Sequence, residues 1–170
     1  MNASALIERL ALQTPVLAGL ADGVAGGQAC WRPAPGRWSI VEVYGHLLDE
    51  EREDFRARLD LTLHRPEADW PPIDPQGWVE ARAYAARDLA GTVAEWRAER
   101  ERSLAWLRAL TAPDWSRAHS HPKFGSLAAG ELLAAWVAHD LLHLRQLAKL
   151  HYDHAAALAA PQGVGYAGDW

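Results

Sequence analysis

The stretch AAWVAHDLLHLRQL, residues 134–147, sets two histidines into a run that is otherwise mostly apolar. His139 and His143 are four residues apart, so on an α-helix both project from one face, with Cβ atoms roughly 5–6 Å apart. Apolar side chains share or flank that face, which must therefore point inward against other helices. These side chains are Leu132, Ala135, Trp136, Leu147 and Leu150. The stretch predicts a long amphipathic helix that ends near residue 151.

Three further segments have apolar residues three to four positions apart, as amphipathic helices do: residues 3–20, 39–62 and 79–110. Loops rich in proline and glycine separate them, and the alternation of apolar and polar residues that marks strands is nearly absent. Four long amphipathic helices joined by such loops predict an all-α, four-helix bundle.

Two of these helices have recognisable starts. SIVE, residues 39–42, forms a capping box, in which Ser39 caps the backbone and Glu42 reaches back to it. Ser126 is placed to cap the last helix.

Composition narrows the class of protein. The chain has 170 residues, 49% hydrophobic and 23% charged, which fits one globular domain. A net charge of −5 without a basic block disfavours nucleic acid as a partner. No apolar run reaches the ~20 residues that cross a membrane, and the first residues lack a secretory pattern. We therefore expect no membrane partner and a cytoplasmic location, which the single cysteine, Cys30, also favours.

A third histidine changes the interpretation of the first two. His46 lies one turn into the second helix, flanked by Val43 and Leu47, and can also face the bundle interior. A lone buried histidine is usually a satisfied core residue, but three imidazoles from two helices suit a divalent metal and leave a position open. Zinc fits this ligand set best, and nickel, iron or manganese fit it too.

Two rival motifs are weaker. HDLLH, residues 139–143, resembles the zincin motif, but Asp140 replaces the glutamate base and no third zincin ligand follows at the expected spacing. The dipeptide at 139–140 is also found in HD-type phosphohydrolases, whose pattern needs a nearer upstream histidine than His46. Asp140 is expected to point off the ligand face.

Two motifs together resemble a known family. RWSIVEVYGHLLDEE (residues 37–51) and GSLAAGELLAAWVAHDLLHLRQL (residues 125–147) are similar to the DinB/YfiT-like metalloenzymes. The resemblance implies an up-and-down four-helix bundle, a single domain over residues 1–151, and a C-terminal tail over residues 152–170. It also implies that one divalent metal is bound by three histidines, and that the protein is a homodimer. The three positions that match the family motif are His46, His139 and His143.

The same resemblance implies a reaction class. Family members of known activity transfer or isomerise small electrophiles with low-molecular-weight thiols such as bacillithiol or mycothiol, so the chain is expected to be a thiol S-transferase acting on a small-molecule substrate. The metal would lower the pKa of the thiol. A metal-dependent hydrolase that activates water is an alternative. Another is a stress-response or binding module whose metal site is structural or vestigial.

Two acidic residues and one loop complete the predicted site. Asp49 and Glu50 follow His46 by about one turn, where a carboxylate can orient a ligand imidazole, or they belong to a solvated acidic face. The proline-rich loop at residues 65–78 is expected to form a pocket rim through Trp70 and Trp78, or to cover the end of the bundle.

Overall fold

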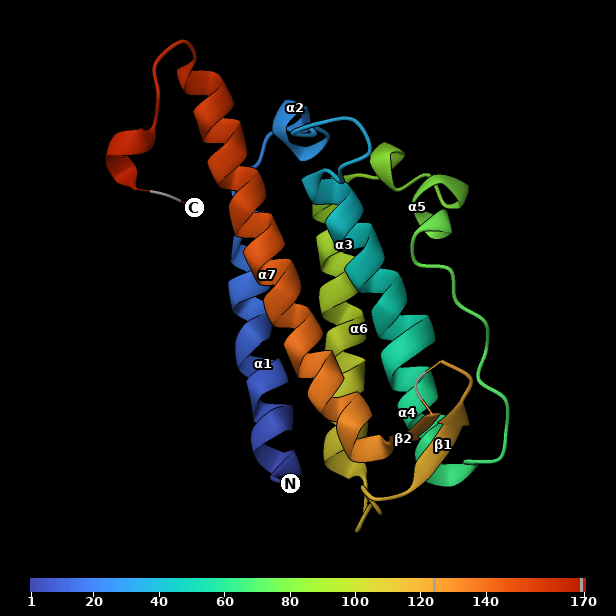
Figure 1. Cartoon of the computed structure of the whole chain (residues 1–170). Coiled ribbons are helices and arrows are strands. Elements are labelled where there is room, and N and C mark those ends of the chain that lie inside the picture. The colour runs from blue at the N-terminus through green and yellow to red at the C-terminus, as the bar shows by residue number, and fades with distance from the viewer. Residues whose placement is uncertain (124, 169) are drawn as a thin grey trace.

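The computed structural model describes residues 1–123, 125–168 and 170. Four long helical rods lie side by side along most of its length (Figure 1). Three of them are α1 (Ala3–Gly19), α6 (Leu89–Ala109) and α7 (Ala129–Ala159). The fourth rod consists of α3 (Ile40–Asp49), a π-helical segment η1 (Glu50–Phe55) and α4 (Arg56–His64). The predicted all-α, four-helix bundle is thus confirmed.

Short elements lie at the two ends of the bundle. Near one end are the helices α2 (Gly26–Ala29) and α5 (Gly77–Ala81) and the 3₁₀ turns η2 (Tyr84–Ala86) and η3 (Gly165–Ala167). At the other end, β1 (Ala118–His121) pairs antiparallel with β2 (Gly125–Ala128), with Ser120 opposite Ser126.

Hydrogen bonds between side chains and backbone N–H groups determine where α3, α6 and α7 begin. The predicted capping box is present, with the Ser39 backbone N–H donating to Glu42 over 2.8 Å. Ser126 lies in β2 and does not cap α7; there the Ala128 backbone N–H donates to Glu131 over 2.8 Å. The predicted 79–110 helix is broken, because Asp88 caps a new start by accepting from the Gly91 backbone N–H.

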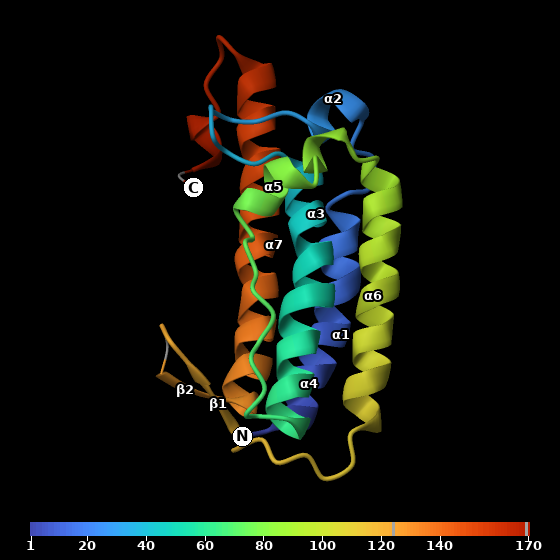
Figure 2. The same ribbon diagram turned by 90° about the vertical axis from the view of Figure 1, so that its right-hand side faces the viewer.

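The helices do not alternate in direction along the chain, although the up-and-down arrangement implied by the resemblance would require it. Residues 65–76 run back along the outside of α3 and α4 to the end where α3 begins (Figure 2). As a result α6 runs parallel to the α3–α4 rod, so that Glu51 meets Arg100 and Arg56 meets Ser103. The contacts of α1 with α7 are parallel as well, while α7 lies antiparallel to α3.

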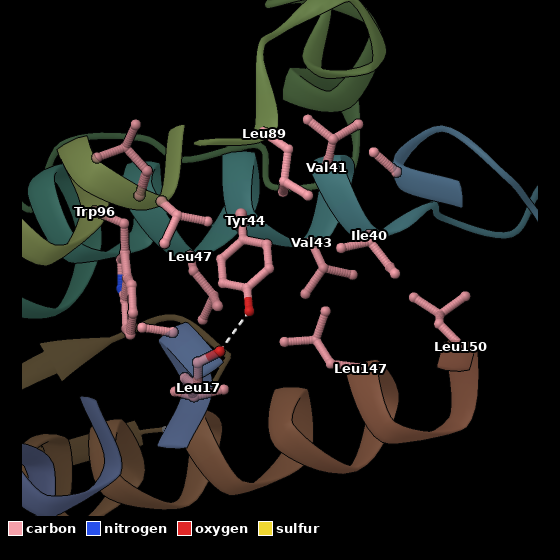
Figure 3. Packing of buried hydrophobic residues seen from close by; sticks show 14 residues of the cluster. Leu17, Ile40, Val41, Val43, Tyr44, Leu47, Leu89, Trp96, Leu147 and Leu150 are labelled. Atoms are coloured by element: carbon pink, nitrogen blue, oxygen red, sulfur yellow. Dashed lines mark hydrogen bonds between the residues drawn. The ribbon is translucent and has the colours of Figure 1, made fainter. Parts of the chain in front are cut away.

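Two apolar clusters fill the bundle. In the first, Tyr44 packs among leucines and Trp96 and donates its hydroxyl proton to the Leu17 carbonyl (Figure 3). The second cluster lies toward the hairpin end and is built around Leu59, Leu133 and other fully buried residues. Where one cluster gives way to the other along the helices, buried polar side chains and the half-buried His139 form what we call the polar layer. Its members are Gln13, His46, Glu50, Glu51, Arg100, His139, Asp140 and His143.

Candidate metal centre

The three predicted histidines meet in the polar layer. His46 comes from α3, and His139 and His143 come from successive turns of the antiparallel α7. The His139 Nε2 atom lies 3.2 Å from His46 Nε2 and 3.1 Å from His143 Nε2. The three potential ligand atoms all lie within 4.8 Å of one another, so the structure brings together the residues that the sequence singled out.

These separations fit a shared cation. Ligand nitrogens about 2.0–2.1 Å from one metal ion lie roughly 2.9–3.4 Å apart when they subtend octahedral or tetrahedral angles. Hydrogen bonds between the three imidazoles explain the short Nε2–Nε2 distances less well. His143 Nδ1 lies 2.8 Å from Gln146 Oε1, which can only accept, so Nδ1 carries the proton and Nε2 presents a lone pair. A single hydrogen on His139 Nε2 would then have to serve both neighbouring imidazoles.

Burial keeps the three imidazoles neutral, which is the form that binds metal. Desolvation, reinforced by the nearness of His143, lowers the pKa of His46 to about 3 and that of His139 to about 2. The pKa of His143 is also lowered by burial, against an opposing contribution from Gln146. No competing proton therefore has to be displaced at neutral pH.

Glu50 is the acidic neighbour of this cluster. Its Oε1 lies 3.8 Å from His46 Nδ1, and neither atom has a hydrogen-bond partner among the described residues. Burial, with the nearby Asp54 carboxylate, raises the pKa of Glu50 to about 9. Asp49 ends α3, and Glu50 and Glu51 begin η1; all three side chains are buried.

The expectation that Asp49 orients His46 is wrong. The Asp49 carboxylate accepts the hydroxyl proton of Tyr84 and lies 2.8 Å from Arg82 Nη1. Its side chain therefore ties α3 to the segment that follows α5. Gln146, one turn beyond His143, makes the carbonyl contact that we had expected from a carboxylate.

Asp140 points away from the ligand nitrogens, as predicted. Its carboxylate accepts two hydrogen bonds from Arg100, and Glu51 accepts from the same guanidinium at 2.8–3.0 Å. The Trp136 indole N–H also donates to Glu51 over 3.2 Å. This network was not predicted from the sequence, although acidic residues at inward positions of two helices indicate that a buried cation lies between them.

The cluster has aromatic neighbours and an open side. Trp38 lies against His46 and Phe55 against His139, with ring centroids 5.1 and 5.0 Å apart. A pocket of about 360 Å³ exposes His46 and His143 and is also lined by Gly36, Arg37, Trp38, Gln76 and Gln146.

The 65–78 loop contributes to that pocket through Gln76. Its tryptophans lie elsewhere: Trp70 stacks on His119 at a centroid distance of 4.3 Å, and Trp78 is covered by Arg82. The aromatic wall of the site is instead Trp38. This residue precedes the capping box, and the sequence analysis had given it no role in the site.

Comparison with known proteins agrees with this arrangement. Residues 9–147 match the family model described as the DinB superfamily. Two curated relatives are similar over 117 residues, 68% of this chain. One is a "Putative metal-dependent hydrolase" of Oceanobacillus iheyensis, 27% identical, and the other is the "Putative metal-dependent hydrolase YfiT" of Bacillus subtilis, 28% identical. The matched region spans 66% and 65% of these relatives, just under two thirds of each.

A solved structure shares the fold. Bacillus subtilis YfiT, described as having an unusual four-helix bundle topology, superposes with a TM-score of 0.80 at 22% identity, covering 90% of this chain and 87% of that one. The family model covers well over half of this chain, and the chain belongs to the DinB superfamily.

Proposed function

We propose that this chain is a metal-dependent hydrolase of small molecules whose divalent metal, zinc in the first instance, is bound by His46, His139 and His143. The observation that carries the proposal is the convergence of three neutral imidazole nitrogens beside an open pocket. Both curated relatives are named as metal-dependent hydrolases, which supports the same reaction class.

Three protein ligands leave a coordination position open, as in catalytic rather than structural zinc sites. The metal, when bound, supplies Lewis acidity and lowers the pKa of a water in that position toward 7. The chain itself contributes orientation: Gln146 fixes the tautomer of His143, and the Glu50 carboxyl lies beside the outer nitrogen of His46. Trp38 and Phe55 exclude water from two sides of the imidazoles.

A second candidate is thiol S-transfer, the activity expected from the resemblance. It is favoured by a second pocket, of about 410 Å³, that also reaches His143 and adjoins the first. Two neighbouring pockets at one ligand leave room for a low-molecular-weight thiol and a separate electrophile. The third possibility is a structural or vestigial metal site. Such a site does not require open pockets beside its ligands, so the two pockets do not favour it.

A metal-dependence assay separates these functions. The metal-free protein and the protein reconstituted with zinc, nickel, iron or manganese are assayed against small esters, amides and lactones, with and without cellular thiols. The proposal expects hydrolysis that needs metal but no thiol. Turnover only with a thiol would establish the S-transferase instead, and no turnover with any metal or thiol would favour the structural site.

The oligomeric state, the domain bounds and the cellular location are also proposals. We propose a homodimer, for which the exposed Leu12, Val16 and Leu141 on the neighbouring helices α1 and α7 offer apolar surface. We also keep the single domain over residues 1–151, although α7 continues to Ala159. No helix among the described residues is long and apolar enough to cross a membrane. The cytoplasmic location stays a prediction.

A further inference from the structure

The two pockets beside the three histidines share one wall. Both are lined by Arg37, Trp38, His143 and Gln146, and we call the combined depression the groove. On one side it exposes His46, and on the other it extends along α7. The lining of that extension includes Leu142, Arg145, Lys149, Leu150, Asp153 and Trp170.

The groove carries positive charge although the chain as a whole has a net charge of −5. Its cationic side chains are Arg37, Arg145 and Lys149, and its acidic side chain is Asp153. Asp153 is already paired with Lys149 one turn away on α7. Two guanidinium groups are therefore left without a carboxylate partner among the described residues.

Among the described residues most arginine side chains contact a carboxylate or another oxygen atom. Arg32, Arg56 and Arg100, for example, each hold a carboxylate or a side-chain oxygen of a neighbouring helix. Five of the described arginines make no such contact, and two of these five, Arg37 and Arg145, line the groove. Arg37 and Arg145 come from different segments, the 31–38 connection and α7, and line the same depression. Both side chains are exposed, so the groove presents them to solvent.

A tight turn at Gly36 positions the Arg37 side chain at the groove. Gly36 adopts a φ of +75°, which L side chains rarely adopt, and the Arg37 N–H closes the turn onto the Ala34 carbonyl over 3.1 Å. The turn delivers Arg37 to the groove and Trp38 to the ring of His46. One short segment thus supplies both a cation and the aromatic wall of the metal centre.

We propose that Arg37 and Arg145 bind an oxyanion, a carboxylate or phosphate, on the substrate whose reacting bond lies at the three histidines. The inference deepens the proposed function and rests on it for the position of the reacting bond. A guanidinium binds either oxyanion through two parallel N–H donors. The apolar side chains of Trp38, Leu142, Leu150 and Trp170 line the groove near the arginines, so the substrate carries an apolar or aromatic body next to its anion.

The test measures binding rather than turnover. Three probes share an aromatic body: 3-phenylpropionate, phenyl phosphate and the neutral 3-phenylpropanamide. Their dissociation constants are measured by calorimetry on metal-free and zinc-loaded protein. We expect at least one anionic probe to bind the metal-free protein about tenfold or more tightly than the amide, and to weaken when salt is raised from 50 to 500 mM.

Variants locate the site. Arg37→Gln/Arg145→Gln should weaken the anionic probe about tenfold and leave the amide unchanged. Arg97→Gln, which removes an exposed arginine from α6, is the matched control and should leave both unchanged. The two probes tell which oxyanion is preferred.

The inference is overturned if the amide binds as tightly as both anions, or if the double variant binds them as wild type does. Anion binding that appears only with zinc and survives the double variant also overturns it, because the metal would then be the anion site. Intact, arginine-dependent binding without hydrolysis of any compound would instead defeat the proposed function and leave the oxyanion site standing.

Discussion

At the scale of single residues, the candidate site depends on where the outer nitrogen of each imidazole finds its partner. For His143 the partner is Gln146, and for His46 the nearest acid is Glu50 at 3.8 Å. Asp49, the residue next to Glu50, is committed to Tyr84 and Arg82. Glu50 therefore lies beside the three histidines, whereas the adjacent Asp49 links α3 to the segment that follows α5.

This difference predicts opposite effects on metal affinity. Gln146→Leu removes the oxygen that fixes the His143 tautomer, and we expect the zinc dissociation constant to rise by about 10–100-fold. Asp49→Asn should leave it within about threefold of wild type, because Asp49 does not contact the imidazoles. Competition titration with a chromophoric chelator measures both. Equal losses in the two variants would show that Asp49 acts on the site after all.

The buried histidines also predict how the stability of the metal-free protein varies with pH. The folded-state pKa of His139, about 2, lies well below the ordinary value of 6.5. Above pH 6.5 the residue is neutral in both states and has no effect. Below it the unfolded chain binds a proton that the folded chain refuses, so the free energy of unfolding falls as the pH falls toward the folded-state pKa.

The His139→Leu variant isolates this contribution, because every other group titrates in both proteins. Between pH 7 and 5.5 the metal-free wild type should lose roughly 1 kcal/mol of unfolding free energy relative to the variant, measured by urea titration. A difference that does not change with pH would mean that His139 can take up a proton in the folded protein.

At the scale of elements, the polar layer joins three helices through one buried guanidinium. Arg100 of α6 is held by Glu51 of η1 and by Asp140 of α7, and all three side chains are almost fully buried. Asp140 is the neighbour of His139 on α7, so the network holds the ligand helix against α6 and the η1 segment. Such a network is expensive to disrupt, because removing one partner leaves the other charges buried and unpaired.

Arg100→Met should therefore lower the free energy of unfolding by about 3–5 kcal/mol in urea titration. Arg97→Met, at an exposed position of the same helix, should change it by no more than about 0.5 kcal/mol. The variant Arg100→Met/Glu51→Leu/Asp140→Leu leaves no charge behind and should recover much of the loss. If Arg100→Met were as stable as Arg97→Met, the network would not hold the helices together.

At the scale of the whole molecule, the bundle places the polar layer between two apolar clusters. The three histidines could be predicted from the sequence, because their spacing and apolar flanks are local features of two helices. The direction of α6 could not be predicted from the sequence. It depends on residues 65–76, which run back along the outside of α3 and α4, and the spacing of apolar residues in a helix does not indicate which way the helix runs in the bundle. Ser126 was predicted to cap the last helix, but it lies in β2 opposite Ser120 of β1. That pairing depends on a second strand, so the sequence around Ser126 alone does not predict it.

The sequence also could not predict the partners of Asp49 or the position of Arg145 in the groove. Arg82 and Tyr84 are more than 30 positions from Asp49, in a segment that the sequence analysis took for the start of a regular helix. Arg145 depends on the 31–38 connection folding across α7 to form the groove. Contacts between segments far apart in the sequence decide both, whereas the i, i+4 pair of histidines needed only one helix.

Metal content with site variants tests the central claim most directly. The purified protein, reconstituted with zinc and freed of excess metal, is analysed by elemental mass spectrometry beside His46→Ala, His139→Ala, His143→Ala and the control His64→Ala, which alters an exposed histidine at the end of α4. We predict one zinc per chain in the wild type and the control, and loss of stoichiometric zinc in each of the three site variants. One zinc per chain retained by all three, each still folded, would contradict the account.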